Sequence, residues 1–213
     1  MEKILIAGTN GLANEVASWV CNKFEVIGYT SPTESNENEL GLLGKHFLDS
    51  TVTPELTGTD LAILAVGTVG IKEKLYGLYK NKGFRFPTIV HPSSVISSSV
   101  MLGEGVIVAP NCVISPNVKV GIVTYINFQC GIGHDSVIGD FVQINPGSQL
   151  GGFTHVGNRT LIGSGSTILQ RVNIGTDVTV ASGSVVFAKV VDNSTAMGNP
   201  GRRVRAFEKI GSS

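Results

Sequence analysis

The chain is poor in tryptophan, cysteine and charge, and each shortage narrows what it can be. Of its 213 residues one is Trp, three are Cys and 15% are charged, with 16 Lys and Arg against 16 Asp and Glu. Without an excess of positive charge, we expect neither nucleic acid nor an anionic membrane as a partner. No apolar run approaches the roughly 20 residues of a membrane-spanning helix. The start, Met1 to Gly8, is typical of a buried strand and not of a signal peptide, so we expect a cytoplasmic protein.

What the chain has instead is a repeat of six residues that covers nearly half of it. From Val90 to Val186 every sixth residue is Val, Ile or Leu, without a gap. A helix repeats its faces every 3.6 residues and a strand every two, so neither explains this period alone. Hexapeptide repeats specify a parallel β-helix. Three hexads make one triangular coil, so residues eighteen apart should stack about 4.8 Å apart, and the run predicts about five to six coils.

A second column of residues agrees with this phase. Four residues after each aliphatic stands a small or β-branched residue, as expected beside a large one in a narrow prism. Cys112 and Cys130 belong to this column, one coil apart, and we expect buried thiols without a metal or disulfide role. The position directly after the aliphatic is often Gly or Asn, as at Gly133, Asn145 and Gly151. Because these residues tolerate a positive φ, we expect them to turn the corners of the prism.

Residues 1–88 carry a different pattern, in which strands alternate with helices. Apolar runs predict strands over 3–8, 25–29 and 61–66, and helical spacing predicts helices over 11–22 and 72–82. The polar segment 31–39 is typical of a loop. This alternation predicts a small parallel α/β domain of the Rossmann-like kind.

The turn after the first strand, Gly8-Thr9-Asn10-Gly11-Leu12, is a worn form of the glycine fingerprint of dinucleotide-binding domains. A helix that begins directly after a strand offers backbone N–H groups and a positive dipole end to a phosphate. No acid follows the second strand to hold a ribose, which argues against a nicotinamide cofactor. A diphosphate-linked ligand at this turn, or a tight turn without a ligand, are the two remaining interpretations.

Three features together resemble the bacterial sugar O- and N-acyltransferases. They are the glycine turn, the run Ile89-Val90-His91-Pro92-Ser93 followed by the hexads, and the segment Gly133-His134-Asp135-Ser136. The ending Met197-Gly198-Asn199-Pro200-Gly201-Arg202 resembles the Gly-x-Pro-Ala-Lys segment that closes such enzymes, with Gly201 for Ala and Arg202 for Lys. The family includes nucleotide-sugar 4-amino N-acetyltransferases of surface-glycan synthesis and sialic acid O-acetyltransferases, and the resemblance covers essentially the whole chain.

This resemblance implies a fold and an assembly. The fold is an N-terminal α/β Rossmann-like domain over 1–88, followed by a left-handed parallel β-helix with a C-terminal tail over 89–213. The assembly is a homotrimer that holds acetyl-CoA, the cosubstrate, in grooves between neighbouring prisms, and no metal is implied. A physical argument agrees, because a lone prism has no second wall to hold a thioester beside an outward-pointing side chain.

The resemblance places the catalytic histidine of the family at His134, two residues after Ile132 and so on the outside of the prism. A histidine near neutral pH can accept a proton as an amine attacks a thioester, and Asp135 can orient its ring. Gly152 lies eighteen residues on, directly above His134 in the next coil. It leaves space for the thioester, and its N–H can stabilise an oxyanion. We therefore expect His134, Asp135 and Gly152 to be catalytic.

The other expected contacts belong to the two substrates. Ser164 and Ser182 stack eighteen apart in the column where the family lays the pantetheine arm, and Arg202 could pair with a phosphate of coenzyme A or remain solvated. The expected acetyl-CoA contacts are Gln143, Gly152, Ser164, Ser182 and Arg202. The expected sugar-nucleotide contacts are Gly8, Asn10, Gly11, Leu12, Ser31, Gly67 and Thr68.

The leading interpretation is an acetyl-CoA-dependent N-acetyltransferase that acts on an amino group, at C4, of a nucleotide-linked amino-deoxy sugar, by direct transfer. The runner-up is an O-acetyltransferase of sialic acid or a related free sugar, since a base serves a hydroxyl as well as an amine. A third interpretation is a β-helical scaffold with a decayed site. Leu12, Ser31 and Pro32 depart from the family pattern and motivate it, whereas the intact His134-Asp135 pair opposes it. These departures also leave the nucleotide and the sugar open.

Overall fold

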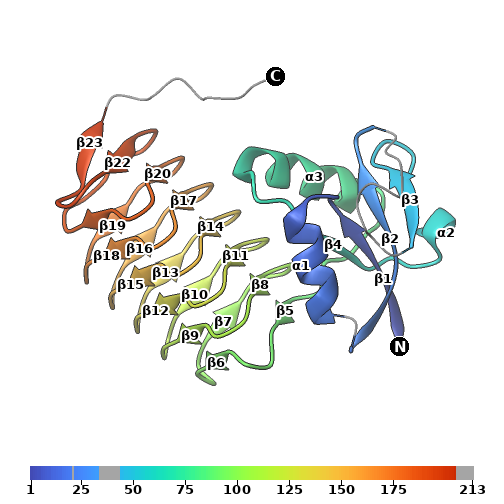
Figure 1. Ribbon diagram of the computed structural model, residues 1–213, viewed down its shortest axis with the longest axis horizontal. Helices are drawn as coiled ribbons and strands as arrows, with labels where there is room; N and C mark the ends of the chain where they lie inside the picture. The colour runs from blue at the N-terminus through green and yellow to red at the C-terminus, as the bar shows by residue number, and fades with distance from the viewer. Residues whose placement is uncertain (21, 34–43, 205–213) are drawn as a thin grey trace. The chain divides into compact units, whose positions relative to one another are not determined.

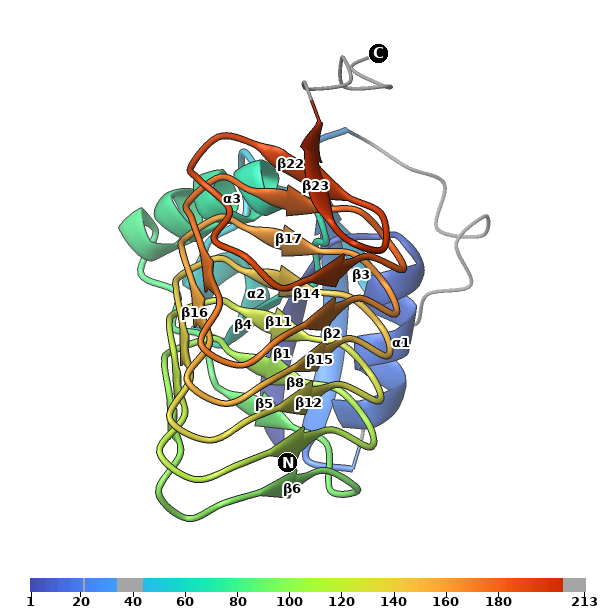
Figure 2. The ribbon, with the colours of Figure 1, turned by 90° about the vertical axis from the view of Figure 1, so that its left-hand side faces the viewer.

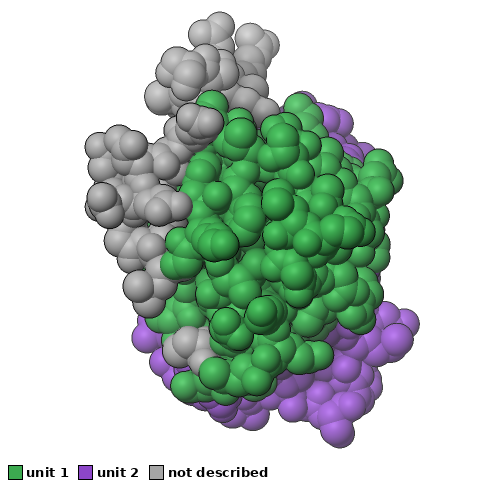
Figure 3. Space-filling model, turned by 90° about the vertical axis from the view of Figure 1, so that its right-hand side faces the viewer, with its two compact units in different colours: residues 1–89 green, residues 90–213 purple. Residues whose placement is uncertain are grey.

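In a computed structural model of the chain, the described residues are 1–20, 22–33 and 44–204. They belong to two compact units, Met1–Ile89 and Val90–Ser213. We refer to them as unit 1 and unit 2, and Figure 3 colours them separately. Among the described residues, no helix combines the length and the apolar character that crossing a membrane requires.

Unit 1 is a parallel sheet flanked by helices (Figure 1). Its strands lie in the order β3-β2-β1-β4, and every neighbouring pair is parallel. The strands are β1 (Glu2–Ala7), β2 (Phe24–Ser31), β3 (Lys45–Leu48) and β4 (Ala62–Leu64), and the helices are α1 (Gly11–Val20), α2 (Pro54–Thr57) and α3 (Val69–Asn81).

The sheet of unit 1 forms around the apolar part of its central strand β1, Ile4–Ala7. Ile4, Leu5 and Ile6 of β1 are fully buried, as expected for a strand covered on both faces. Helix α1 buries Ala13, Val16 and Val20, which the helical period places on one face. The core of unit 1 therefore follows from its hydrophobic pattern.

The predicted elements of unit 1 are present with shifted ends. Helix α3 begins at Val69, three residues before the predicted start, and β4 is shorter than its apolar run. The patterns gave no signal for β3 and α2. The predicted loop over 31–39 is wrong at its first residue, since Ser31 ends β2, and its part over 34–39 lies outside the described residues.

Unit 2 is a three-sided parallel β-helix, whose coils are seen stacked one above the other in Figure 2. Successive two-residue strands visit a six-stranded, a five-stranded and an eight-stranded sheet in turn. Residues eighteen apart pair in register, as Gly131 with Gln149 and Val137 with His155. The hexad aliphatics fill the interior and form one continuous hydrophobic cluster.

The strands of unit 2 begin with β5 at the unit boundary. They are β5 (Ile89–Val90), β6 (Val95–Ile96), β7 (Met101–Leu102), β8 (Ile107–Val108), β9 (Val113–Ile114), β10 (Lys119–Val120), β11 (Tyr125–Ile126), β12 (Gly131–Ile132), β13 (Val137–Ile138), β14 (Gln143–Ile144), β15 (Gln149–Leu150), β16 (His155–Val156), β17 (Leu161–Ile162), β18 (Thr167–Ile168), β19 (Asn173–Ile174), β20 (Thr179–Val180), β21 (Val185–Val186), β22 (Thr195–Met197) and β23 (Arg202–Val204).

The last coil is shorter than the others. Thr179 pairs with Thr195, sixteen residues later, and Val190 forms a bridge with Ile174. The hexad phase placed Val190 in the column of small residues above Val172, and this prediction is wrong because the shortened coil moves it. β23 then pairs with β22 in the antiparallel sense and ends the described part of the prism.

The corners contradict the expectation about glycine. Positive φ falls at the third residue after the aliphatic, as at Asp135 (58°) and Arg171 (63°), and not at the first. A Cβ atom on Gly151 would lie 2.5 Å from the backbone nitrogen of Gln170 in the next coil, and one on Gly133 would collide with the backbone of Gly152. At Gly133 and Gly151 glycine is required because the next coil passes too close for a side chain.

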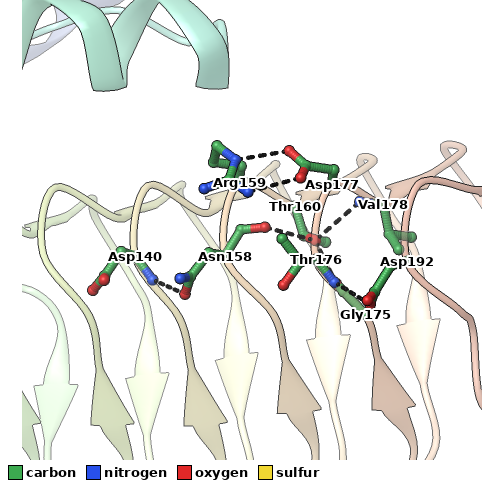
Figure 4. A network of polar contacts seen from close by, with 9 residues as sticks. All are labelled: Asp140, Asn158, Arg159, Thr160, Gly175, Thr176, Asp177, Val178 and Asp192. Atoms are coloured by element: carbon green, nitrogen blue, oxygen red, sulfur yellow. Dashed lines mark hydrogen bonds and ion pairs between the residues drawn. The ribbon is translucent and has the colours of Figure 1, made fainter.

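A ladder of side-chain oxygens caps the coils along the edge between the five-stranded and eight-stranded sheets (Figure 4). The Asn158 side-chain oxygen accepts from the Asp140 N–H, and Asp192 accepts from the Thr176 N–H, each at 2.9 Å. Asp140 itself accepts from the Ile122 N–H at 2.9 Å. Each cap satisfies a turn N–H that would otherwise lack a protein partner. This edge is therefore closed by its own side chains.

Cys112 and Cys130 are buried, as predicted, and both are free cysteines. Their thiols donate to backbone carbonyls of the neighbouring turns, at 3.0 Å to Asn127 and 3.2 Å to Asn145. The hydrogen bond with Cys112, and then burial, raise the pKa of the Cys130 thiol. Both residues act as small core residues of the prism.

Candidate active site

His134 lies in the turn between β12 and β13, on the edge between the six-stranded and five-stranded sheets. We call this the His134 edge. The side chain is 57% exposed, and its Nδ1 donates a hydrogen bond of 2.7 Å to Oδ2 of Asp135. In the described part of the chain, Nε2 has no hydrogen-bond partner. A neutral ring with its proton on Nδ1 therefore presents a basic nitrogen to the outside.

Asp135 is held from the coil below by Asn117. The side-chain amide of Asn117 donates a hydrogen bond of 3.0 Å to Oδ1 of Asp135, so the two carboxylate oxygens have separate donors. These bonds, first that from His134 and then that from Asn117, lower the pKa of Asp135 below its usual value. The carboxylate is thus charged at neutral pH and able to orient the imidazole.

Gly152 lies directly against the imidazole, one coil above it. A Cβ atom on Gly152 would lie 2.9 Å from Nε2 of His134 and 3.0 Å from Cε1. Any side chain there would push the ring aside. The ring can occupy its position because Gly152 has no side chain.

The backbone N–H of Gly152 differs from its equivalents on the edge of Figure 4. Gly152 occupies the same hexad position as Ile122 and Asp140, whose N–H groups are capped from the coil above. Gln170 stands in that place above Gly152, and among the described residues no acceptor is found for the Gly152 N–H. A free donor next to a basic nitrogen is the arrangement that acyl transfer needs.

Phe153 and Arg171 continue the His134 edge upward. The rings of His134 and Phe153 meet edge to face, with centroids 5.1 Å apart and planes at 84°. The Arg171 guanidinium carbon lies 4.7 Å from the centroid of the Phe153 ring. An aromatic ring therefore stands next to the imidazole, and a cation lies against that ring.

Three of the residues expected to bind acetyl-CoA lie away from His134 within one chain. Ser164 and Ser182 are exposed in turns between the eight-stranded and six-stranded sheets, on a different edge, which we call the serine edge. Gln143 lies on β14, only 3% exposed, and its amide donates to the Asn145 side-chain oxygen at 3.1 Å. One copy of unit 2 thus does not bring these residues to His134.

Arg202 lines a hollow of about 340 Å³ at the C-terminal end of unit 2. Lys189, Arg203 and Phe187 also line it, so three cations and an aromatic ring contribute to the hollow. Phe187 lies two coils above Gly151, in the column next to Gly152. The hollow therefore lies further along the His134 edge. Among the described residues, no group of three or more His, Cys, Asp or Glu is placed to hold a metal ion.

The residues expected to bind the sugar nucleotide lie at one edge of the sheet of unit 1. Gly8, Asn10 and Gly11 follow β1, and Gly67 and Thr68 follow β4, the parallel neighbour of β1. Asn10 and Thr68 accept the first backbone bonds of α1 and α3. The N-termini of both helices consequently lie at the carboxyl end of the sheet. Leu12, in the first turn of α1, is half-buried.

Gly8 and Gly11 differ in whether the fold leaves room for a side chain at their positions. Gly8 has φ of 128°, and a Cβ atom there would lie 2.6 Å from the Ala65 carbonyl oxygen. Around Gly11, in contrast, no heavy atom lies within 4 Å of the Cβ position. Gly8 is needed by the fold, whereas Gly11 leaves open space at the start of α1, where an anion is favoured.

Ser31 ends β2 at the same edge and has a partner that the sequence did not reveal. Its hydroxyl donates to the Thr33 carbonyl at 2.5 Å and lies 2.7 Å from Nε2 of His46 on β3. Because the single hydroxyl proton is used, Nε2 of His46 is the donor of the second bond. Ser31 is only 7% exposed. The imidazole of His46 is the larger of the two side chains at this edge.

The chain resembles known transferases in its repeats and in its whole fold. The model of the bacterial transferase hexapeptide (six repeats) family matches residues 153–188. A histidine-to-asparagine mutant of perosamine N-acetyltransferase from Caulobacter crescentus, in complex with CoA and GDP-perosamine, is 28% identical. The match covers 97% of this chain and 98% of that one, with a TM-score of 0.88. Among curated proteins, no sequence matches significantly.

The chain is a hexapeptide-repeat sugar acyltransferase. Two further structures share the fold, each with 24% identity. The acetyltransferase domain of PglB from Neisseria gonorrhoeae FA1090, in complex with acetyl coenzyme A, has a TM-score of 0.85 over 95% of this chain and 99% of that one. WeeI from Acinetobacter baumannii AYE has a TM-score of 0.81 over 96% and 100%. With these repeats, the parallel strands of the acyltransferase fit a left-handed β-helix.

The acyltransferase brings together the residues predicted for its chemistry. His134, Asp135 and Gly152 meet on one edge, as the eighteen-residue stacking predicted. Sequence reasoning missed Asn117 and Phe153, although each lies eighteen residues from Asp135 and the same rule would have found them.

Proposed function

We propose that the acyltransferase moves the acetyl group of acetyl-CoA onto the amino group, at C4, of a nucleotide-linked amino-deoxy sugar of surface-glycan synthesis. The observation that carries the proposal is His134, which pairs with Asp135 through Nδ1 and leaves Nε2 free beside the N–H of Gly152. The fit over nearly the full length to an enzyme in complex with CoA and GDP-perosamine supports the substrate classes.

In the proposed reaction, the amine nitrogen attacks the thioester carbonyl carbon, a C–N bond forms and the C–S bond breaks. Nε2 of His134 accepts the amine proton and returns it to the departing sulfur. Asp135 stabilises the protonated ring, and the Gly152 N–H donates to the oxygen that becomes negative. The buried Cys112 and Cys130 cannot reach the substrates, so the transfer is direct.

We propose the hollow with Lys189, Arg202 and Arg203 as the end of the acetyl-CoA site that holds phosphate. Three cations at one hollow match an anion of high charge, and arginine binds phosphate through paired N–H groups. The hollow lies along the edge that carries His134, which supports a cosubstrate that runs along this edge from the thioester to the phosphates. Gln143, Ser164 and Ser182 stay proposed contacts that a neighbouring copy would bring to this groove.

Unit 1 is proposed to be a Rossmann-like domain that holds the nucleotide diphosphate. The strand order β3-β2-β1-β4 follows the first four strands of doubly wound dinucleotide-binding sheets, which bind ligands at the carboxyl edge. The open space at Gly11 and the N-termini of α1 and α3 suit a diphosphate. Ser31 and His46, at the same edge, are proposed contacts of the ribose or the base, and Leu12 is a proposed apolar contact.

The proposal is tested by incubating the protein with acetyl-CoA and a panel of UDP-, dTDP- and GDP-linked 4-amino sugars, with thiol release as the readout. We expect turnover with at least one member, and a product whose added acetyl survives mild alkali because it is an amide. An alkali-labile acetyl on free sialic acid, without transfer to any amine, would establish the O-acetyltransferase instead. His134→Ala is the control for transfer that does not need the site.

A further inference from the structure

We propose that Phe153, seated against Arg171, is a positioning residue that holds the His134 imidazole in its reactive orientation. The inference rests on the proposed function, because it concerns the base of that reaction. Asp135 and Asn117 fix the ring from below through hydrogen bonds, and Phe153 and Arg171 act from above through ring contacts.

The His134 ring needs such support because it has little of its own. It is more than half exposed, and one hydrogen bond at Nδ1 leaves the ring free to tilt about that bond. Gly152 leaves room on one side, because only an added Cβ atom would meet Nε2 there. The edge-to-face contact with Phe153, at 84°, limits the tilt of the ring, since such ring pairs prefer a defined geometry.

Phe153 itself is held by Arg171. Phe153 is 44% exposed, so an isolated ring there would sample several rotamers. The guanidinium 4.7 Å from its centroid provides a cation–π contact that favours one of them. The chain of contacts thus runs from Arg171 through Phe153 to His134.

The backbone does not require these two side chains. Phe153 and Arg171 have φ of 57° and 63°, in the left-handed region that bulky residues rarely adopt. On the serine edge the same hexad position is glycine at Gly147, Gly165 and Gly183, with φ between 66° and 72°. The fold accepts glycine there, so the aromatic ring and the cation are present for what their side chains contact.

The kinetic test uses Phe153→Leu, Phe153→Tyr, Arg171→Met and a matched control. Phe153→Leu keeps apolar bulk but removes the ring pair, and we expect kcat to fall about tenfold with both KM values within twofold. Phe153→Tyr keeps the aromatic ring, so kcat should stay at the wild-type value. Arg171→Met should lower kcat about threefold. Arg159→Met removes another left-handed arginine, ion-paired to Asp177 on a different edge, and should leave kcat unchanged.

Repeating the Phe153 substitution in a His134→Ala enzyme shows whether Phe153 positions His134 or contacts the substrate itself. In His134→Ala, the residual rate should not respond to Phe153→Leu, because Phe153 acts through the missing ring. An equal loss in that background, or a rise in the KM for the sugar nucleotide with kcat unchanged, would overturn the inference. A loss in Arg159→Met as large as in Arg171→Met would also overturn it, since general loosening of the prism would then be the cause.

A readout without turnover keeps this inference distinct from the proposed function. In protein with labelled histidine, the ring protons of His134 should show a ring-current shift that Phe153→Leu removes and Phe153→Tyr retains. If no acceptor is acetylated but the shift is present, the proposed function fails while the contact stands. If turnover is present and the shift is absent, the positioning role of Phe153 is wrong.

Discussion

The imidazole of His134 lies so close to Gly152 that a single added methyl group would meet Nε2 at 2.9 Å. The two residues are eighteen apart, so one turn of the prism brings a basic nitrogen and a free N–H donor together. Neither the basic nitrogen nor the N–H donor would form a catalytic site by itself. Their combination depends on the stacking of coils, on glycine in the upper coil and on Asp135 in the lower one.

Gly152→Ala should therefore disable catalysis while the fold persists. The new methyl would displace the ring and crowd the donor, and loss of an oxyanion donor alone typically costs about a hundred- to a thousandfold in kcat. Gly77→Ala in α3, where no heavy atom lies within 4 Å of the Cβ position, is the control for the substitution itself. Full activity of a folded Gly152→Ala enzyme would contradict the site.

The pH dependence of kcat/KM tests the His134–Asp135 pair. The rate should fall on the acid side, where the base takes up a proton, and His134→Ala should lose about a hundred- to ten-thousandfold. The bond to His134 lowers the pKa of Asp135, so the carboxylate stays charged through the acidic limb. Asp135→Asn should therefore lower kcat over the whole pH range, because the ring loses its charged partner. Unchanged kcat in a folded Asp135→Asn enzyme would show that the pair does not act in the reaction.

Asn117→Gly tests the support of Asp135 from below. Without the 3.0 Å bond, the pKa of Asp135 should rise toward its usual value, and kcat should fall severalfold, by roughly the worth of one charge-assisted hydrogen bond. Asn111→Gly is a matched control, because Asn111 has the same left-handed conformation, with φ of 59°, on the serine edge. Equal losses in both variants would assign the effect to the backbone and not to Asp135.

The stacking rule explains how much of this protein the sequence predicts. The hexads predict the prism, its register of eighteen and the meeting of His134 with Gly152, because burial of each aliphatic permits only one phase. They do not predict which turn residue takes positive φ, since that depends on backbone crowding from the next coil, as at Gly151. They also do not predict the shortened last coil that moves Val190.

Unit 1 was less predictable for a physical reason. β1 and α1 follow from their hydrophobic patterns, whereas β3 is short and half-exposed, so its sequence carries little periodic signal. His46 is therefore invisible in sequence as a partner of Ser31, although they share a bond of 2.7 Å. Only the pairing of β2 with β3 brings the two together.

Arg202→Ala and Arg203→Ala should weaken binding of acetyl-CoA. Each loss removes a cation from the hollow, and we expect the KM for acetyl-CoA to rise about tenfold with the KM for the sugar nucleotide unchanged. Because the contact is ionic and exposed, the difference from wild type should shrink at high salt. If both KM values stay at the wild-type level, the phosphates bind elsewhere.

The placement of Ser164 and Ser182 leads to the prediction about assembly. They lie on the serine edge and His134 lies on another, so one acetyl-CoA can contact both only where two copies meet. Three-sided prisms that pack edge to edge close with threefold symmetry, and we expect a homotrimer in sedimentation. The stronger test mixes two inactive variants, His134→Ala and Ser164→Trp with Ser182→Trp, through co-expression. At random mixing, a site between two neighbouring copies has an intact His134 in about half of the cases and intact serines in about half. Both are intact in about one case in four, so about a quarter of wild-type activity should return. If each site were built within one chain, every subunit in the mixture would carry a defect and no activity would return.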